Sequence, residues 1–117
     1  MQLTLGPVLY NWAPDRWRDF YFRIAEEAPV DAAVIGEIVC SKRSPFFAAH
    51  MPEVIERLAA CGKQDVLRSL ILVPLKRERQ QMAELAANAD FMVEANDLTC
   101  LGSLANRPHA IGPFVNI

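Results

Sequence analysis

The feature that most constrains the fold is a short, continuous apolar stretch, residues 33–35, that ends at Gly36. It lacks the polar alternation of a half-exposed strand, so both faces of a strand built from it are apolar. Such strands are typical of parallel sheets covered by helices. The residues that follow, from Glu37 to Arg43, are therefore predicted at the carboxyl end of a strand, where parallel sheets bind their ligands.

Apolar periodicity elsewhere predicts strands that alternate with helices. The spacing of Trp17, Tyr21 and Ile24 predicts a helix over residues 15–27, and Pro52 near a first turn with Gly62 at a C-terminal cap predicts a second helix between them. The remaining helices are predicted at 76–88 and 98–105, and the strands at 2–5, 31–36, 66–73, 90–94 and 110–115. This order predicts an α/β chain, one domain over residues 1–117, with about five parallel strands alternating with four helices.

The number of units predicts a partial TIM-like barrel. A closed (β/α) barrel needs eight strand–helix units in about 250 residues, so four and a half units are roughly half of one. Its first and last strands would lack neighbours, and open strand edges favour pairing with other chains. We therefore expect a half barrel that binds the rest of its own barrel or associates with itself. A small open sheet that covers its last strand by dimerising is the alternative.

Charge and composition narrow the class of protein. The formal net charge of −2 and the pI of about 5.6 do not indicate nucleic acid as a partner. The chain opens without a basic region followed by a long apolar one, and its longest apolar run, residues 70–75, contains a proline, which argues against an export signal or a membrane span. Three cysteines in different contexts do not suggest a disulfide framework. We expect a soluble protein of the reducing cytoplasm.

Cys40 is the strongest candidate for a reactive or metal-binding side chain. Lys42 and Arg43 follow it, and nearby cations favour the thiolate, the form that acts as nucleophile or ligand. The same basic pair could bind an anion, although such pairs are usually only solvated. Free cysteines more often simply pack, so an inert Cys40 is the commoner alternative, and Cys61 and Cys100 are interpreted as structural.

Polar residues also follow or interrupt the other predicted strands. Glu37 and Glu94 follow the second and fourth strands, where parallel barrels collect catalytic carboxylates. Glu94 could instead pair with Arg68, and Asp97 could simply cap the next helix. Arg68 and Ser69 are unusual within a buried strand, so we expect them to line the polar interior of a barrel or the mouth of a ligand site.

Six segments carry a resemblance to a known family. They are LGPVLYNW (5–12), DFYFRIAE (19–26), GEIVCSKR (36–43), ACGKQDVLRSLILV (60–73), FMVEANDL (91–98) and IGPFVNI (111–117). Together they resemble the collagenase-like peptidase family, U32, along the whole chain. The most specific part is the combination of GEIVCSKR, VEANDL and the opening LGPVLY.

The resemblance implies a (β/α) barrel and a four-iron four-sulfur cluster held by four cysteines, the first of which matches Cys40. The family's other three lie beyond residue 117, and Cys61 and Cys100 do not match them. One thiolate cannot hold a cluster that takes four, so no cluster is expected in this chain alone. The groups that would surround the cluster or face a substrate are Glu37, Lys42, Arg43, Glu94 and Asn96.

The family members that the chain most resembles imply a function. They are accessory proteins of oxygen-independent ubiquinone biosynthesis, and they act in its hydroxylation steps with a sister protein. Peptidases and RNA-modifying enzymes of the same broad family are a first alternative, although no nucleophile and base can be paired on these residues. A non-catalytic half barrel that binds a partner through its sheet edges is a second. Whether the complete protein is an enzyme stays open, and this chain alone is expected to be inactive.

Overall fold

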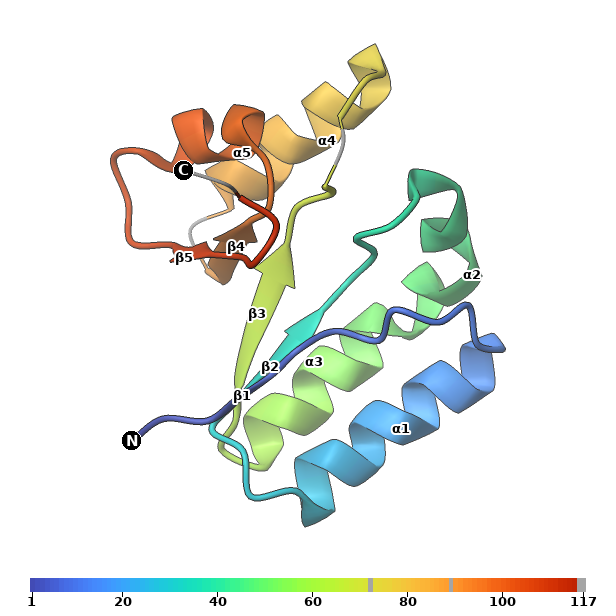
Figure 1. Ribbon diagram of the computed structural model, residues 1–117. Coiled ribbons are helices and arrows are strands. Elements are labelled where there is room, and N and C mark those ends of the chain that lie inside the picture. The colour runs from blue at the N-terminus through green and yellow to red at the C-terminus, as the bar shows by residue number, and fades with distance from the viewer. Residues whose placement is uncertain (72, 89, 116–117) are drawn as a thin grey trace.

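The computed structural model describes residues 1–71, 73–88 and 90–115, and it shows a curled sheet with helices along its outer side (Figure 1). Neighbouring strands are parallel and lie in sequence order. The strands are β1 (Thr4–Leu5), β2 (Ala32–Ile35), β3 (Gln64–Arg68), β4 (Met92–Ala95) and β5 (Ala110–Ile111). The predicted α/β half barrel with five parallel strands is confirmed.

Four main helices connect the strands. They are α1 (Pro14–Glu27), α3 (Met51–Ala60), α4 (Lys76–Ala87) and α5 (Leu98–Leu104). α1 and α3 pack side by side beside β2, while α4 and α5 pack together beside β4 (Figure 1). In the part of the chain that the structure describes, no helix is long and apolar enough to cross a membrane.

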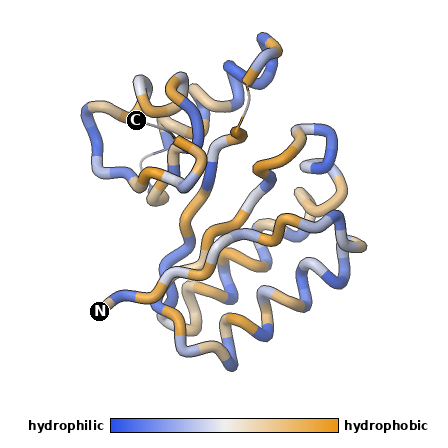
Figure 2. Tube along the Cα trace, viewed as in Figure 1, coloured by the Kyte–Doolittle hydropathy of each residue, from blue (hydrophilic) through white to orange (hydrophobic). Residues whose placement is uncertain are grey.

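Alternate residues of the strands face the helices or the inner side of the curled sheet. Ala33 and Ile35 pack against α1 and α3, and Val93 and Ala95 pack against α4 and α5. The intervening positions form a separate apolar cluster, which consists of Ala32, Val34, Val66 and Met92. Because side chains alternate along a strand, Arg68 and Glu94 continue this inner face toward the carboxyl edge of the sheet. The tube in Figure 2 shows the hydrophobic strand segments giving way to polar ones.

The third strand lies earlier in the chain than the predicted 66–73. β2 ends before Gly36, whose φ of 110° is open mainly to glycine and turns the chain out of the sheet. Past the end of β2, the chain that continues β3 has no strand to pair with on the β2 side. Instead, the Ile71 amide donates to the Ile38 carbonyl, in the loop that follows β2, at 3.2 Å. Leu72, within the predicted strand, lies outside the described residues.

The fifth strand and the segment after β2 also differ from the prediction. The fifth strand stops at Ile111 because Gly112 begins a turn, in which the Val115 amide bonds the Gly112 carbonyl at 3.3 Å. Residues 116 and 117 lie outside the described residues. The segment between β2 and the helix predicted from Pro52 contains a 3₁₀ turn, η1 (Ser41–Arg43), and one helical turn, α2 (Ser44–Phe47), followed by η2 (Ala48–His50). Pro45 in the first turn of α2 is compatible with helix, which periodicity in so short a segment cannot reveal.

Tyr21 joins α1 to the sheet and to the N-terminal segment. Its side chain is fully buried, and its hydroxyl donates to the Val34 carbonyl at 3.0 Å and accepts from the Val8 amide at 3.3 Å. Burial raises the pKa of this hydroxyl to about 12, so it stays protonated and able to donate at neutral pH. The Trp17 ring packs against the Tyr21 ring, with 4.8 Å between the ring centres. One side chain therefore fixes three segments.

We predict that Tyr21→Phe lowers the free energy of unfolding by about 1–3 kcal/mol, since it leaves two backbone groups without their partner while keeping the ring packing. Urea denaturation followed by circular dichroism measures this. Tyr10→Phe is the control, because Tyr10 is largely exposed and should change stability by less than about 0.5 kcal/mol. Equal effects of the two changes would contradict the role of the hydroxyl.

Candidate functional site at the carboxyl edge

Three polar side chains meet at the carboxyl edge of β3 and β4. Arg68 and Glu94 lie in register on the two strands, with 3.2 Å between Arg68 Nη2 and Glu94 Oε1. Asn96 Nδ2 donates to the same Glu94 oxygen at 3.0 Å. The predicted pairing of Glu94 with Arg68 is therefore confirmed, and one carboxylate oxygen is shared by two nitrogens.

Arg68 is the least compensated charge in this cluster. Its side chain is 0% exposed, and none of its three nitrogens has a hydrogen-bond partner among the described residues, because the contact with Glu94 is an ion pair without hydrogen-bond geometry. Burial lowers the pKa of the guanidinium to about 10, and Glu94 opposes this shift. Arg68 is still charged at neutral pH, and a buried cation with so little compensation costs free energy.

Ser69 and Asn96 hold each other in place beside this pair. The backbone amide of Asn96 donates to Ser69 Oγ at 2.7 Å, and the side-chain nitrogen, Asn96 Nδ2, lies 3.4 Å from the Ser69 carbonyl oxygen. Every group that contacts Nδ2 is an acceptor, which fixes the orientation of the carboxamide. Asn96 Oδ1 is left buried, and no described residue donates to it.

Two glycines border the cluster. A Cβ on Gly112 would lie 1.9 Å from Asn96 Oδ1 and 2.8 Å from Glu94 Oε1, so no other residue fits at this position without displacing both side chains. A Cβ on Gly36 would lie 3.5 Å from Arg68 Cγ, an ordinary contact, and there the positive φ excludes other residues more than the space does. The cluster is thus bounded by backbone on both sides.

Cys40 lies in the loop that follows β2, next to the same edge. Its thiol is free and the residue is half-buried. Glu37 Oε1 accepts from the amides of Ile38, Val39 and Cys40 at 3.1, 2.6 and 3.1 Å. The Glu37 carboxylate is therefore engaged by the loop backbone, and it sets the path of the chain that carries Cys40.

A second carboxylate holds the other end of this loop. Ser41 Oγ donates to Glu78 Oε1 at 2.5 Å, and Glu78 Oε2 accepts from the Leu75 amide at 3.1 Å at the start of α4. The hydrogen bond from Ser41, with that from Leu75, lowers the pKa of Glu78. Sequence reasoning missed Glu78. Its place in the first turn of a predicted helix, where acidic residues cap amides, was the available signal.

Two of the remaining predicted residues bond the backbone. Lys42 is exposed, and Arg43 Nη1 donates to the Leu9 carbonyl at 3.1 Å. Asp97 accepts from the Cys100 amide at 2.9 Å, so its predicted role as a helix cap is confirmed. The structure therefore brings Glu94 and Asn96 together with Arg68, while Glu37, Cys40, Lys42 and Arg43 share the adjacent loop.

The three cysteines of this chain lie on separate elements. Cys61 is exposed where α3 ends, and this helix leads into the amino end of β3. Cys100 is buried in α5, and burial raises the pKa of its thiol. Within the described ranges no three His, Cys, Asp or Glu side chains could together hold a metal ion. Cys40 is thus separated from both other cysteines by the elements that carry them.

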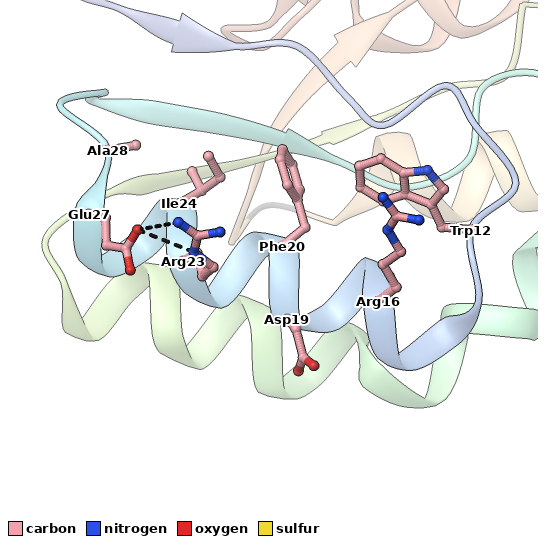
Figure 3. Close-up of a pocket in the computed structure, with 8 residues that line it drawn as sticks. All are labelled: Trp12, Arg16, Asp19, Phe20, Arg23, Ile24, Glu27 and Ala28. Carbon is pink, nitrogen blue, oxygen red and sulfur yellow. Dashed lines mark hydrogen bonds and ion pairs between the residues drawn. The ribbon is translucent and has the colours of Figure 1, made fainter.

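A groove of about 540 Å³ runs along α1 on the side where Trp12, Phe20 and Ile24 point toward the strands, and it contains none of the predicted site residues (Figure 3). Trp12, Phe20 and Ile24 give it an apolar wall, and the Arg16 guanidinium lies 4.8 Å from the Trp12 ring centre. The helix was predicted from the spacing of Trp17, Tyr21 and Ile24, of which the first two are buried. The fully buried stripe continues through Ala25 instead of Ile24, which leaves Ile24, like Phe20, half-exposed in the groove.

No family model matches this chain, and no solved structure matches it. The functional conclusions therefore depend on the carboxyl-edge geometry and on the sequence segments described above.

We predict that Gly112→Ala destabilises the protein by about 1–3 kcal/mol, because the new methyl group overlaps the Asn96 carboxamide and the Glu94 carboxylate. Thermal unfolding measures the effect. Gly102→Ala is the matched control: it lies within α5 with no atom within 4 Å of its Cβ position, so it should be neutral or stabilising by up to about 1 kcal/mol. A neutral Gly112→Ala would contradict the packing described here.

Glu78 makes stability depend on pH in the acid range. Its pKa is lower in the folded than in the unfolded chain, so its contribution is present above the unfolded value of about 4.3 and is lost as pH falls through the folded value. We predict that unfolding free energy falls less between about pH 5 and pH 3 in Glu78→Gln than in the unmodified chain. Glu84→Gln, an exposed change on the same helix, controls for loss of a charge. Identical pH profiles for Glu78→Gln and the unmodified chain would exclude this role.

Proposed function

We propose that the chain is the amino-terminal half of a UbiV-like iron–sulfur protein, an accessory of the hydroxylation steps in oxygen-independent ubiquinone biosynthesis. It acts in the cytoplasm as a heterodimer with a UbiU-like sister protein. The observation that carries the proposal is the place of Cys40: a free, half-buried cysteine in the loop that follows β2, on the same carboxyl edge of the sheet as the Arg68–Glu94–Asn96 cluster. The segments 36–43, 60–73 and 91–98, which carry the family resemblance, supply these same residues.

The bracing of the Cys40 loop supports a ligand role. Glu37 fixes the amides up to Cys40, and the hydrogen bond from Ser41 to Glu78 fixes the residue after it. Metal ligands are commonly oriented by such outer hydrogen bonds, which also tune the metal. Of the four thiolates required, this chain contributes Cys40, and the other three would come from beyond residue 117. A four-iron four-sulfur cluster would then belong to the complete protein.

The sheet edges support a role for further chain or for a partner. Within the described residues, β1 and β5 each pair with one strand, and Leu3 and Ile111 are 45% and 51% exposed. Completion by the rest of the barrel and self-association of this chain are both predictions from these open edges. An interaction module without chemistry is the second candidate function, since open edges and the α1 groove would serve it equally well.

The test uses the protein expressed from the complete coding sequence, including any residues after 117, and purified without oxygen. We predict that iron and acid-labile sulfide, at about four atoms each per chain, are lost in Cys40→Ser and retained in Cys61→Ser. Equal loss or equal retention in both variants would exclude Cys40 as a specific ligand, as would a downstream sequence without three further cysteines.

The same preparations distinguish the second candidate. Size-exclusion chromatography with the UbiU-like sister protein follows association independently of iron. The interaction module would be favoured if the unmodified protein is purified without iron and its affinity for the sister protein equals that of Cys40→Ser. Iron that depends on Cys40 favours the redox accessory.

A further inference from the structure

Arg68 has hydrogen-bonding capacity that the rest of the described chain does not use. A guanidinium carries five N–H donors in a fixed plane, and none of these finds an acceptor among the described residues although the side chain is 0% exposed. By contrast Arg107 donates to the carbonyls of Ala86, Asn88 and Phe91. The chain therefore satisfies one partly buried arginine with backbone carbonyls and leaves the more deeply buried one without them.

Packing alone does not explain an arginine at this position. The neighbouring inner-face positions are apolar, namely Val34, Val66 and Met92, and an unbranched apolar side chain of similar length would continue that cluster. Replacing a poorly compensated buried charge by an apolar residue is often stabilising. A charge that costs stability and has unused donors is a recurrent mark of a ligand site.

The second unused group defines what the ligand must offer. Asn96 Oδ1 is a buried acceptor without a donor, and it belongs to the side chain that shares Glu94 Oε1 with Arg68. A ligand on these groups therefore presents oxygen acceptors to Arg68 and a hydroxyl donor to Asn96. Glu94, whose side chain is 13% exposed, is the member of the cluster that reaches solvent, so access lies on its side.

We propose that the carboxyl edge of β3 and β4 binds a small oxyanion that also carries a hydroxyl group, such as a hydroxycarboxylate or hydrogen phosphate. Arg68 receives the oxyanion with its planar donors, and Asn96 Oδ1 accepts from the hydroxyl. Glu94 positions both residues and, as an anion itself, favours a ligand of low charge. Backbone at Gly36 and Gly112 bounds the site. The proposal does not rest on the iron–sulfur cluster, because no metal is needed for these contacts.

Calorimetric titration of the purified, iron-free chain with glycolate, phosphate, acetate and chloride tests the proposal. Glycolate or phosphate should bind in a saturable manner, and whichever binds more tightly identifies the source of the oxyanion. Acetate, which lacks the hydroxyl, should bind at least about tenfold more weakly. Equal binding of acetate would overturn the role of Asn96, and no saturable binding of glycolate or phosphate would overturn the site.

Variants separate a ligand role from a structural one. Arg68→Met should unfold at a higher temperature than the unmodified chain without ligand and should lose the titration signal. Arg68→Lys keeps a charge without the planar fork and should bind about 10- to 100-fold more weakly, which provides a test even if the methionine variant does not fold. Arg107→Met is the matched control: it should lower stability and keep binding. An Arg68→Lys that is destabilised but binds normally would show that Arg68 is structural.

Discussion

The register between β3 and β4 is the constraint on which the polar edge of this protein depends. It sets Arg68 opposite Glu94 on the inner face, one step beyond the apolar pair Val66 and Met92. A shift of one residue would move every side chain of the strand to the other face and place Arg68 against the helices. The apolar clusters on both faces therefore keep the charged pair where it is.

Close backbone approach then determines which side chains can occupy this edge. Gly112 lies so near Asn96 and Glu94 that a single methyl group would not fit, and Gly36 turns the chain aside immediately after β2. The outcome is a cluster in which a cation, a carboxylate and an amide share few partners. Such an arrangement is held by the surrounding packing and is itself unfavourable, which is the usual relation between a stable scaffold and a functional site.

Two carboxylates convert the segment after β2 from a simple connection into a fixed loop. Glu37 gathers three successive amides at one end, and Glu78 reaches from α4 to Ser41 at the other. Cys40 lies between them, so its position is determined by hydrogen bonds from two separate elements. This places the candidate thiol and the Arg68 cluster on one edge, as carboxyl ends of parallel strands require.

Local patterns in the sequence determined the alternation of strands and helices, the parallel sheet and the caps at Gly62 and Asp97. These depend on periodicity and on chain order, which a sequence displays directly. Local patterns offered the pairing of Glu94 with Arg68 only as one of two interpretations, and the strand register decided it. Only the tertiary structure decided where β3 ends, which stripe of α1 is buried, and that Glu37 and Glu78 hold the Cys40 loop. Each of these depends on a contact or a missing neighbour between elements, which no local pattern contains.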